Sequence, residues 1–161
     1  MDRIIIRAMM PSDYEKVYKL WQSIEGFGIR SIDDSKSGIE KFLTRNPNTS
    51  VVAVADGEIV GSVLCGHDGR TGYLYHVCVR RDMRRHGIGR QMVVRAMQAL
   101  KDDGINKVSL IAFSDNSVGN AFWHDVGWKE RSDVNYYDFV LNNENITAFN
   151  GKEEKQYGKK D

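Results

Sequence analysis

Three apolar segments separated by two turn signals limit the folds available to this chain more than any other feature. They lie within residues 50–81, SVVAVADGEIVGSVLCGHDGRTGYLYHVCVRR. Asp56-Gly57 between two β-branched runs is a strong signal for a β-hairpin, because both residues tolerate the positive φ that its turn needs. The sequence GRTG at residues 69–72 marks a second turn. The segment therefore predicts three consecutive antiparallel strands.

Helices and short strands are predicted on both sides of this segment. Before it, the sequence predicts a strand over residues 4–9, an amphipathic helix over 11–24, a turn-rich loop over 25–38 and a short helix over 39–46. After it, the sequence predicts a helix over residues 88–104, a strand over 106–113, a helix over 116–127 and a hairpin over 128–141. From residue 143 onward the chain is polar and lacks periodicity. We therefore expect one domain over residues 1–142 and a loose tail over 143–161.

The charge balance argues against a polyanionic partner. A chain of 161 residues suits one compact domain, and its 23 Lys and Arg residues nearly cancel its 22 Asp and Glu residues. No apolar run is long enough for a signal peptide or a membrane span. Cys65 and Cys78 lie in different apolar runs, as is typical of free thiols in a reducing compartment. We expect a cytoplasmic protein that binds no nucleic acid, no membrane and no metal.

Arginines and glycines gather at one turn between the third strand and the long helix. Residues 80–92 read RRDMRRHGIGRQM. A P-loop would need Lys and then Ser or Thr after the second glycine, and a dinucleotide fingerprint would need a third glycine and a parallel βαβ unit. The first N–H groups of a helix nevertheless carry partial positive charge, and Gly87 and Gly89 leave room for a phosphate. The turn suits a diphosphate; the alternative is a tight turn with hydrated arginines.

Two motifs in this chain resemble those of the GCN5-related N-acetyltransferases, the GNAT family. Residues 84–89, RRHGIG, resemble the signature R/Q-x-x-G-x-G/A. Residues 115–128, DNSVGNAFWHDVGW, resemble the later stretch N-x-x-A-x-x-x-Y-x-x-x-G-F, with Asn116, Gly127 and Trp128 on its Asn, Gly and aromatic positions. The predicted order of elements over residues 3–141 is also similar to that of the family. The resemblance implies an α+β fold with a mixed, mostly antiparallel, splayed sheet flanked by helices.

The resemblance also implies an acetyl-CoA-dependent N-acetyltransferase that acts on a primary amine of a small molecule or a peptide. In the family, the signature turn holds the diphosphate of coenzyme A and the preceding strand pairs with the pantetheine arm. The implied cofactor-binding residues are Val77, Cys78, Val79, Arg84, Arg85, His86, Gly87, Ile88, Gly89, Arg90, Asn116 and Trp123. A homodimer is left open, and an acyl-CoA-binding regulator without catalysis is the alternative function.

The catalytic groups are less defined by the resemblance. The frequent family acid is a tyrosine, but Trp123 stands at its position, and an indole N–H is not an acid. The thiolate therefore leaves unassisted or another group protonates it. His76 is the first candidate for the base and Tyr75 is an alternative polar group; the competing interpretation of His76 is a buried structural histidine. Strand alternation places Tyr75, Val77 and Val79 on one face and His76 and Cys78 on the other. Between two valines, Cys78 is expected to be a core residue and not a nucleophile.

The loop that follows the first helix is where the family builds its acceptor pocket. Charged residues there, Glu25, Arg30, Asp33 and Asp34, are candidates for reading the charges of a substrate, and Phe27 is a candidate wall of the pocket. A solvated loop with capping acids is the alternative.

Overall fold

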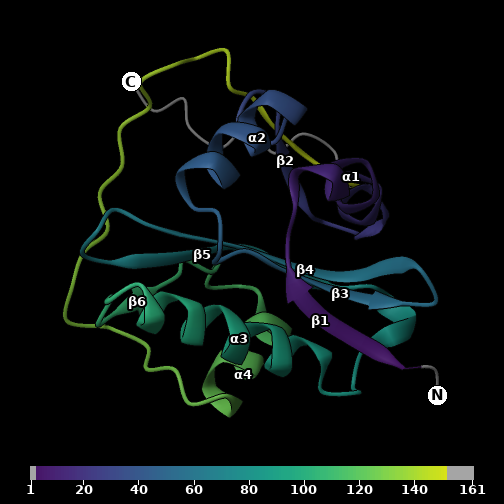
Figure 1. Cartoon of the computed structure of the whole chain (residues 1–161). Coiled ribbons are helices and arrows are strands. Elements are labelled where there is room, and N and C mark those ends of the chain that lie inside the picture. The colour runs from purple at the N-terminus through teal and green to yellow at the C-terminus, as the bar shows by residue number, and fades with distance from the viewer. Residues whose placement is uncertain (1–2, 152–161) are drawn as a thin grey trace.

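The computed structural model describes residues 3–151, which form a sheet with helices on both faces (Figure 1). Residues 152–161 of the predicted tail lie outside the described residues. The strands are β1 (Ile4–Ala8), β2 (Gly28–Arg30), β3 (Val51–Ala55), β4 (Glu58–His67), β5 (Gly72–Val79), β6 (Val108–Ser109) and β7 (Thr147–Phe149). The helices are α1 (Tyr14–Ser23), α2 (Lys36–Arg45), α3 (Ile88–Asp102) and α4 (Ser117–Asp125), with 3₁₀ turns η1 (Pro11–Asp13) and η2 (Arg81–Met83).

The main sheet has the order β1-β3-β4-β5-β6 and confirms the predicted mixed α+β class. All neighbours are antiparallel except β5 and β6. The parallel pair is joined only through Gly72 with Val108 and Tyr73 with Ser109, so β5 continues to Val79 without β6 beside it. The sheet therefore splays at this point, as the sequence resemblance implied.

Two apolar cores lie on opposite faces of this sheet. Helix α3 covers one face through residues at helical spacing, namely Ile88, Met92, Val93, Ala96 and Leu100. Helices α1 and α2 cover the other face, where Trp21 is fully buried beside Leu20 and Leu43. Because β4 is sandwiched between these layers, nearly all of its residues are buried. No helix within residues 3–151 combines the length and the apolar character that crossing a membrane requires.

A β-bulge interrupts the pairing of β4 with β5. Ser62 pairs with Cys78 and Leu64 with Tyr75, so one residue of β4 faces two residues of β5, His76 and Val77. His76 has a φ of 51°, which is rare for a residue other than glycine. The extra residue breaks the strict alternation of side chains. The expectation that Tyr75 shares a face with Val77 and Val79 is therefore wrong, since those valines pack on the α3 core while Tyr75 contacts Phe42 of α2.

The C-terminal part departs from the sequence prediction in two respects. The hairpin predicted over residues 128–141 is absent, and residues 129–141 are irregular and mostly exposed. The segment expected to be a loose tail instead contributes β7, which pairs with β2 in a separate two-stranded sheet. Asn150 extends this anchor, because its side-chain amide donates to the carbonyls of Trp21 and Ile24 at 2.7 and 2.9 Å.

An ion pair joins β1 to the start of α1. The two guanidinium nitrogens of Arg7 contact the two carboxylate oxygens of Asp13 at 2.8 and 2.9 Å, and the Met10 N–H donates to the same carboxylate at 2.8 Å. Burial opposes ionisation of Asp13, but the hydrogen bonds from Arg7 and Met10 outweigh it and lower the pKa of Asp13. The ionised form is therefore the one that stabilises the fold.

We predict that Asp13→Asn destabilises the protein by about 2 kcal/mol at neutral pH, because it leaves the half-buried Arg7 without its charge partner. A group with a depressed folded pKa contributes stability above its unfolded value of about 4, and that contribution is lost as pH falls through the folded pKa. Urea unfolding should therefore show the difference between wild type and variant shrinking below about pH 4. A constant difference across this range would contradict the assignment.

Candidate active site

The first turn of α3 presents backbone donors to the surface. Gly87 caps the helix with a φ of 75°, and the Gln91 N–H donates to its carbonyl at 3.1 Å. The N–H groups of Ile88, Gly89 and Arg90 precede that bond and have no backbone acceptor within the described chain. A Cβ added at Gly87 would meet only the Gln91 side-chain nitrogen, at 3.8 Å. An anion can therefore approach the helix end closely.

Arginine side chains and a strained backbone shape the same turn. Arg85 has a φ of 64°, an uncommon conformation for a non-glycine residue. The Arg84 Nε donates to the carbonyl of Val79 at 3.0 Å, which fixes this guanidinium at the end of β5. His86 and Arg90 are exposed. The predicted signature residues thus form one exposed, positively charged turn rich in N–H donors, which matches the requirements of a diphosphate.

The edge of β5 opens beside this turn. Beyond Tyr73 the strand has β4 on one side and no paired strand on the other within residues 3–151. The main chain of residues 77–79, predicted to face the cofactor arm, lies along this free edge. An extended ligand can pair with such an edge as an added strand does.

Helix α4 packs beside the first turn of α3. A Cβ at Gly89 would lie 3.4 Å from the ring of Phe122, so glycine here lets the two helices approach. Asn116 caps α4, because its side-chain oxygen accepts from the Gly119 N–H at 3.0 Å. Trp123 packs against Phe122 and Trp128, each with ring centroids 4.9 Å apart. Asn116 and Trp123 thus have structural contacts, and their contact with a cofactor stays a prediction.

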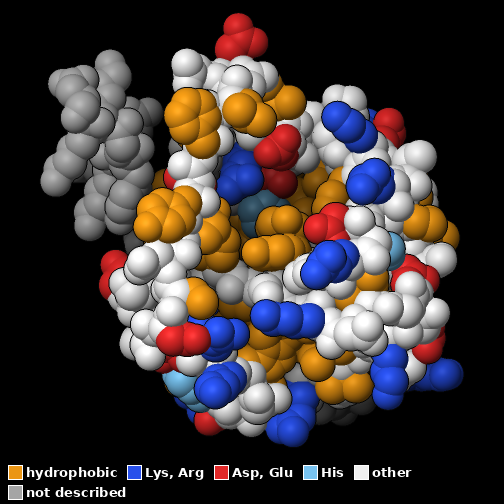
Figure 2. Space-filling view, turned by 90° about the vertical axis from the view of Figure 1, so that its left-hand side faces the viewer, with side chains coloured by type: hydrophobic (Ala, Val, Ile, Leu, Met, Phe, Trp, Pro, Cys, Tyr) orange, Lys and Arg blue, Asp and Glu red, His pale blue; other side chains and the backbone are white. Residues whose placement is uncertain are grey.

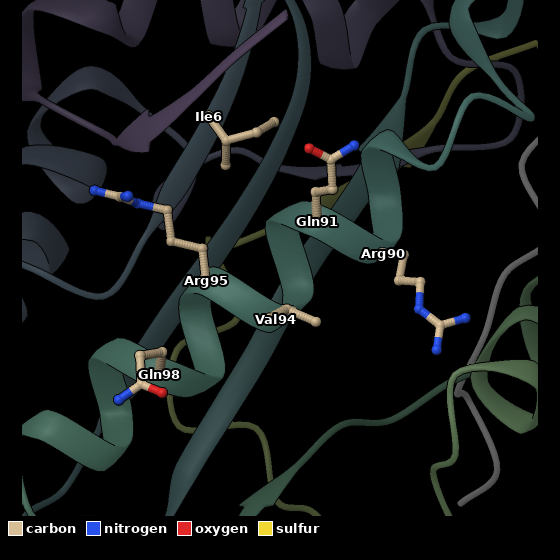
Figure 3. A pocket seen from close by; sticks show the side chains of 6 residues that line it. All are labelled: Ile6, Arg90, Gln91, Val94, Arg95 and Gln98. Carbon is tan, nitrogen blue, oxygen red and sulfur yellow. The ribbon is translucent and has the colours of Figure 1, made fainter.

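A separate hollow lies on the outer side of α3. It has a volume of about 580 Å³ and is lined by Ile6, Arg90, Gln91, Val94, Arg95 and Gln98 (Figure 3). In this view Arg90 and Arg95 extend from α3 in opposite directions. Arg90 is the only predicted site residue among those that line the hollow. It contains no residue of β5, so it is not the place where the predicted cofactor strand and turn meet.

His76, which is partly exposed, pairs with the buried Asp34 on the face of the sheet that α1 covers. The His76 Nε2 lies 2.8 and 2.9 Å from the two carboxylate oxygens of Asp34, whose exposed fraction is 4%. The Arg30 N–H donates to the same carboxylate at 2.7 Å. The histidine ring lies against Trp21 and Phe27, with centroids 4.9 and 4.7 Å away. Because Nε2 faces the carboxylate, it carries the hydrogen, and Nδ1 of the neutral ring is left to accept a proton.

The bulge brings Tyr75 to the same face as His76. Tyr75 packs edge-on against Phe42 and stacks on Tyr73, and 45% of its surface is exposed. Partial burial, and then the neighbouring Tyr73, raises the pKa of Tyr75. The phenol therefore stays protonated at neutral pH and can donate a hydrogen bond.

The thiol of Cys78 lies inside the core next to α1. It sits 3.6 Å from the Ser62 hydroxyl, which in turn accepts a 3.0 Å hydrogen bond from the Trp21 indole. Burial raises the pKa of Cys78 to about 11. A thiolate is therefore scarce at neutral pH, in agreement with the expectation that this residue is a core hydrophobe.

The predicted acceptor loop is held by the C-terminal segment. Asn145 accepts from the N–H groups of Ile32 and Asp33 and donates to the Asp33 carboxylate at 2.8 Å. Glu25 and Arg30 are exposed, and Arg30 lies 3.7 Å from Asp33. Figure 2 shows a hollow bordered by hydrophobic and charged side chains, with a histidine recessed in it.

The structure corrects the role expected for Asp34 and reveals residues that sequence reasoning missed. Asp34 is directed inward to His76 and is not available to read the charges of a substrate. Asn145 and Asn150 were absent from the candidate residues, because a polar segment without periodicity gives no sign of its distant partners. Within residues 3–151, no group of three His, Cys, Asp or Glu side chains is arranged to hold a metal ion.

Comparisons with known proteins agree with this geometry. Residues 14–128 match the model of the acetyltransferase (GNAT) family. An acetyltransferase of Pectobacterium atrosepticum is 35% identical over 113 residues, which cover 70% of this chain and 79% of that protein. An acetyltransferase of Sodalis glossinidius is 30% identical over 129 residues, covering 80% and 89%.

Solved structures share the fold at lower sequence identity. The PaiA N-acetyltransferase of Thermoplasma acidophilum in complex with coenzyme A has a TM-score of 0.69 at 16% identity and covers 92% of this chain and 98% of its own. The aminoglycoside N-acetyltransferase AAC(6')-Iy in complex with CoA has a TM-score of 0.66 at 17% identity, covering 86% and 96%. The family match, the curated relatives and the site geometry lead to one conclusion: the chain belongs to the GNAT family and is an N-acetyltransferase.

Proposed function

We propose that this enzyme uses acetyl-CoA and transfers the acetyl group directly to a primary amine of a small molecule or a peptide. The observation that carries the proposal is the donor-rich turn of residues 84–90 at the end of the strand that holds His76. Two structural neighbours bear CoA in their crystal structures. This reaction needs a site that binds the diphosphate and a base that accepts a proton from the amine. The turn after β5 offers the first, and His76 on β5 offers the second.

The residues present fit the cosubstrate. The free N–H groups at the start of α3 and the guanidinium groups of Arg84 and Arg85 would hold the diphosphate, and the open edge of β5 would pair with the pantetheine arm. Bound acetyl-CoA supplies an activated acetyl thioester.

His76 acts as the general base. An alkyl amine has a pKa of about 10 and arrives as an ammonium ion, so a proton must leave before the nitrogen can attack. Nδ1 of His76 takes this proton, directly or through water, while Asp34 holds the ring through Nε2. The new C–N bond then forms as the C–S bond breaks. Tyr75 protonates the departing sulfur in place of the tyrosine that Trp123 replaces. Its phenolate then takes back, through water, the second proton that the acylated nitrogen loses, and His76 returns the first proton to water.

The acceptor enters beside the loop that precedes α2. Phe27 packs on His76 and forms an apolar wall next to the base. Arg30 and Asp33 are both more than half exposed and carry opposite charges at the rim. Such a rim favours an acceptor that carries its own polar or charged groups around the amine.

The diphosphate seat is tested by Gly87→Asp, which places a carboxylate where the ligand is most negative. Calorimetry should show CoA affinity lowered by about 100-fold. Gly57→Asp is the matched control, because Gly57 has the same φ of 75° and open space around it but lies in the β3–β4 turn. Equal losses in the two variants, or none in Gly87→Asp, would rule out this seat.

The base is tested by His76→Ala, which should lower kcat by about 100-fold and remove the acidic limb of the pH–rate profile, with CoA affinity retained. Asp34→Asn should lower kcat about 10-fold and change the profile, because the amide no longer fixes the tautomer. His67→Ala is the control, since His67 pairs with Asp103 at 3.1 Å outside the site. An unchanged profile in His76→Ala would return His76 to a structural role.

Direct transfer is tested by Cys78→Ala. Since the thiol is buried and protonated, the variant should keep kcat within about threefold, although the small cavity costs about 1 kcal/mol of stability. Mass spectrometry of wild type mixed with acetyl-CoA alone should show no acetylated cysteine. Loss of activity in the folded variant, or an acetyl-thioester on Cys78, would contradict direct transfer.

A further inference from the structure

The guanidinium of Arg30, at the rim of the proposed acceptor site, is left without a close partner. It forms no hydrogen bond to another group of residues 3–151, and its ion pair with the Asp33 carboxylate has an N–O distance of 3.7 Å. A charge-assisted hydrogen bond would be about 2.8 Å long. The side chain of Arg30 is 54% exposed, so its planar fork of donors is open to solvent. A guanidinium left free in this way can bind the carboxylate of a ligand.

The main chain of Arg30 is fixed relative to the candidate base. Its N–H donates to Oδ2 of Asp34 at 2.7 Å, and the same oxygen lies 2.8 Å from Nε2 of His76. Arg30 also pairs with Thr147 in the β2–β7 sheet, which holds it from the other side. Two hydrogen bonds therefore connect the backbone of Arg30 to the imidazole.

The side chain of Arg30 acts on the part of the site that contains Tyr75. Burial, and then Tyr73, raise the pKa of Tyr75, and the positive charge of Arg30 opposes them. Such an electrostatic effect falls off with distance, so the guanidinium and the phenol are near each other. Figure 2 shows a Lys or Arg side chain, together with Asp or Glu side chains, beside the histidine recessed in the hollow. Arg30, Tyr75 and His76 thus border one space.

The carboxylates of the same loop are already engaged or lie elsewhere. Asp34 is 4% exposed, and its oxygens accept from the base and from the loop backbone. Asp33 accepts from the side-chain amide of Asn145 at 2.8 Å. Glu25 stands at the start of the loop, where a Cβ on Gly151 would be 3.7 Å from its Cγ. An anionic group on the acceptor therefore finds a free partner at this rim, and a second cationic group does not.

Aromatic rings line another side of this space. Phe27 lies against His76 with ring centroids 4.7 Å apart. Tyr73 stacks on Tyr75 at 6.0 Å, and Phe42 meets Tyr75 edge-on at 6.1 Å. Because 45% of the surface of Tyr75 is exposed, part of this aromatic surface is available to a ligand. Such a wall favours an apolar side chain on the acceptor.

We propose that the acceptor is a free α-amino acid with an apolar side chain, whose carboxylate binds the guanidinium of Arg30. This inference rests on the proposed function and specifies its acceptor. Because one carbon separates the amine from the carboxylate, a carboxylate held by Arg30 leaves the nitrogen beside His76 and the side chain against the aromatic rings. The N-terminus of a peptide has a neutral amide in place of that carboxylate. The carboxylate is unchanged by the reaction: the acetyl C–S bond breaks, the C–N bond forms, and the product is an N-acetyl amino acid.

The acceptor is tested with compounds that differ in the carboxylate. L-Phenylalanine, L-phenylalaninamide and phenethylamine share an amine and an aromatic side chain; L-leucine and L-methionine, each with its amide, extend the panel. The rates are expressed per concentration of unprotonated amine, because the compounds differ in amine pKa. With wild type and acetyl-CoA, kcat/KM should be at least about 10-fold higher for the amino acids than for the amides and phenethylamine. No preference, or the opposite one, would overturn the proposal.

Arg30→Gln removes the charge and keeps the backbone pairing of β2. The variant should raise KM for L-phenylalanine by about 10-fold or more, while kcat/KM for phenethylamine and KM for acetyl-CoA change by less than about twofold. Arg30→Lys should restore part of the preference, since it keeps the charge without the fork. Arg70→Gln is the matched control, because Arg70 is exposed in the turn between β4 and β5. A preference that survives in Arg30→Gln, or an equal loss for all acceptors, would contradict the role of Arg30.

Calorimetry separates this inference from the proposed function. L-Phenylalanine titrated into the complex of wild type with CoA should bind, and Arg30→Gln should lose this binding. If CoA binds and the amides or phenethylamine are acetylated faster, acetyl transfer to amines stands and the amino-acid acceptor is wrong. If CoA does not bind and no compound of the panel is acetylated, the proposed function fails as well.

Discussion

The pairing of β4 with β5 sets the positions of His76 and Tyr75, the candidate catalytic residues. At the β-bulge, β5 has one residue more than β4, and the positive φ of His76 accommodates it. As a result, Tyr75 and His76 lie on the face that α1 and α2 cover, whereas Val77 and Val79 pack on the core beneath α3. Without the bulge, the candidate base His76 and the phenol of Tyr75 would point to opposite sides of the sheet. The strained histidine is held by two aromatic rings and a buried carboxylate, contacts that offset the cost of its backbone conformation.

The positive potential at the start of α3 comes from local backbone N–H groups and arginines and not from the net charge of the chain. The whole chain carries a formal charge of only +1, yet the start of α3 combines free N–H groups with Arg84 and Arg85. Because the field of a helix end falls off within about one turn, this arrangement acts on a ligand at contact and not at a distance. An almost neutral chain thereby presents one local site that is suited to an anion.

Local patterns were sufficient to predict the elements whose neighbours in sequence are also their neighbours in space. The hairpin at Asp56-Gly57, the amphipathic face of α3 and the glycine turn before it all follow from short-range rules and agree with the structure. The bulge could not be predicted, because a histidine at positive φ has no sequence signature. The partnership of Asp34 with His76 depends on tertiary contact, so the aspartate was assigned to the substrate. The prediction of a hairpin over residues 128–141 was wrong for a related reason. These residues have the composition of strands, but composition does not determine which sheet edge a strand pairs with.

The ties between the C-terminal segment and the loop before α2 have an evolutionary consequence. Asn145 fastens this segment to the loop before α2, and Asn150 fastens it to the end of α1, both more than a hundred positions earlier in the chain. The family match ends at residue 128, before this segment begins. Selection can thus reshape the candidate acceptor loop by altering residues beyond the family match, without changing the strands and helices of the matched region. The residues that hold this loop and those that form the main sheet can then diverge along separate stretches of one gene.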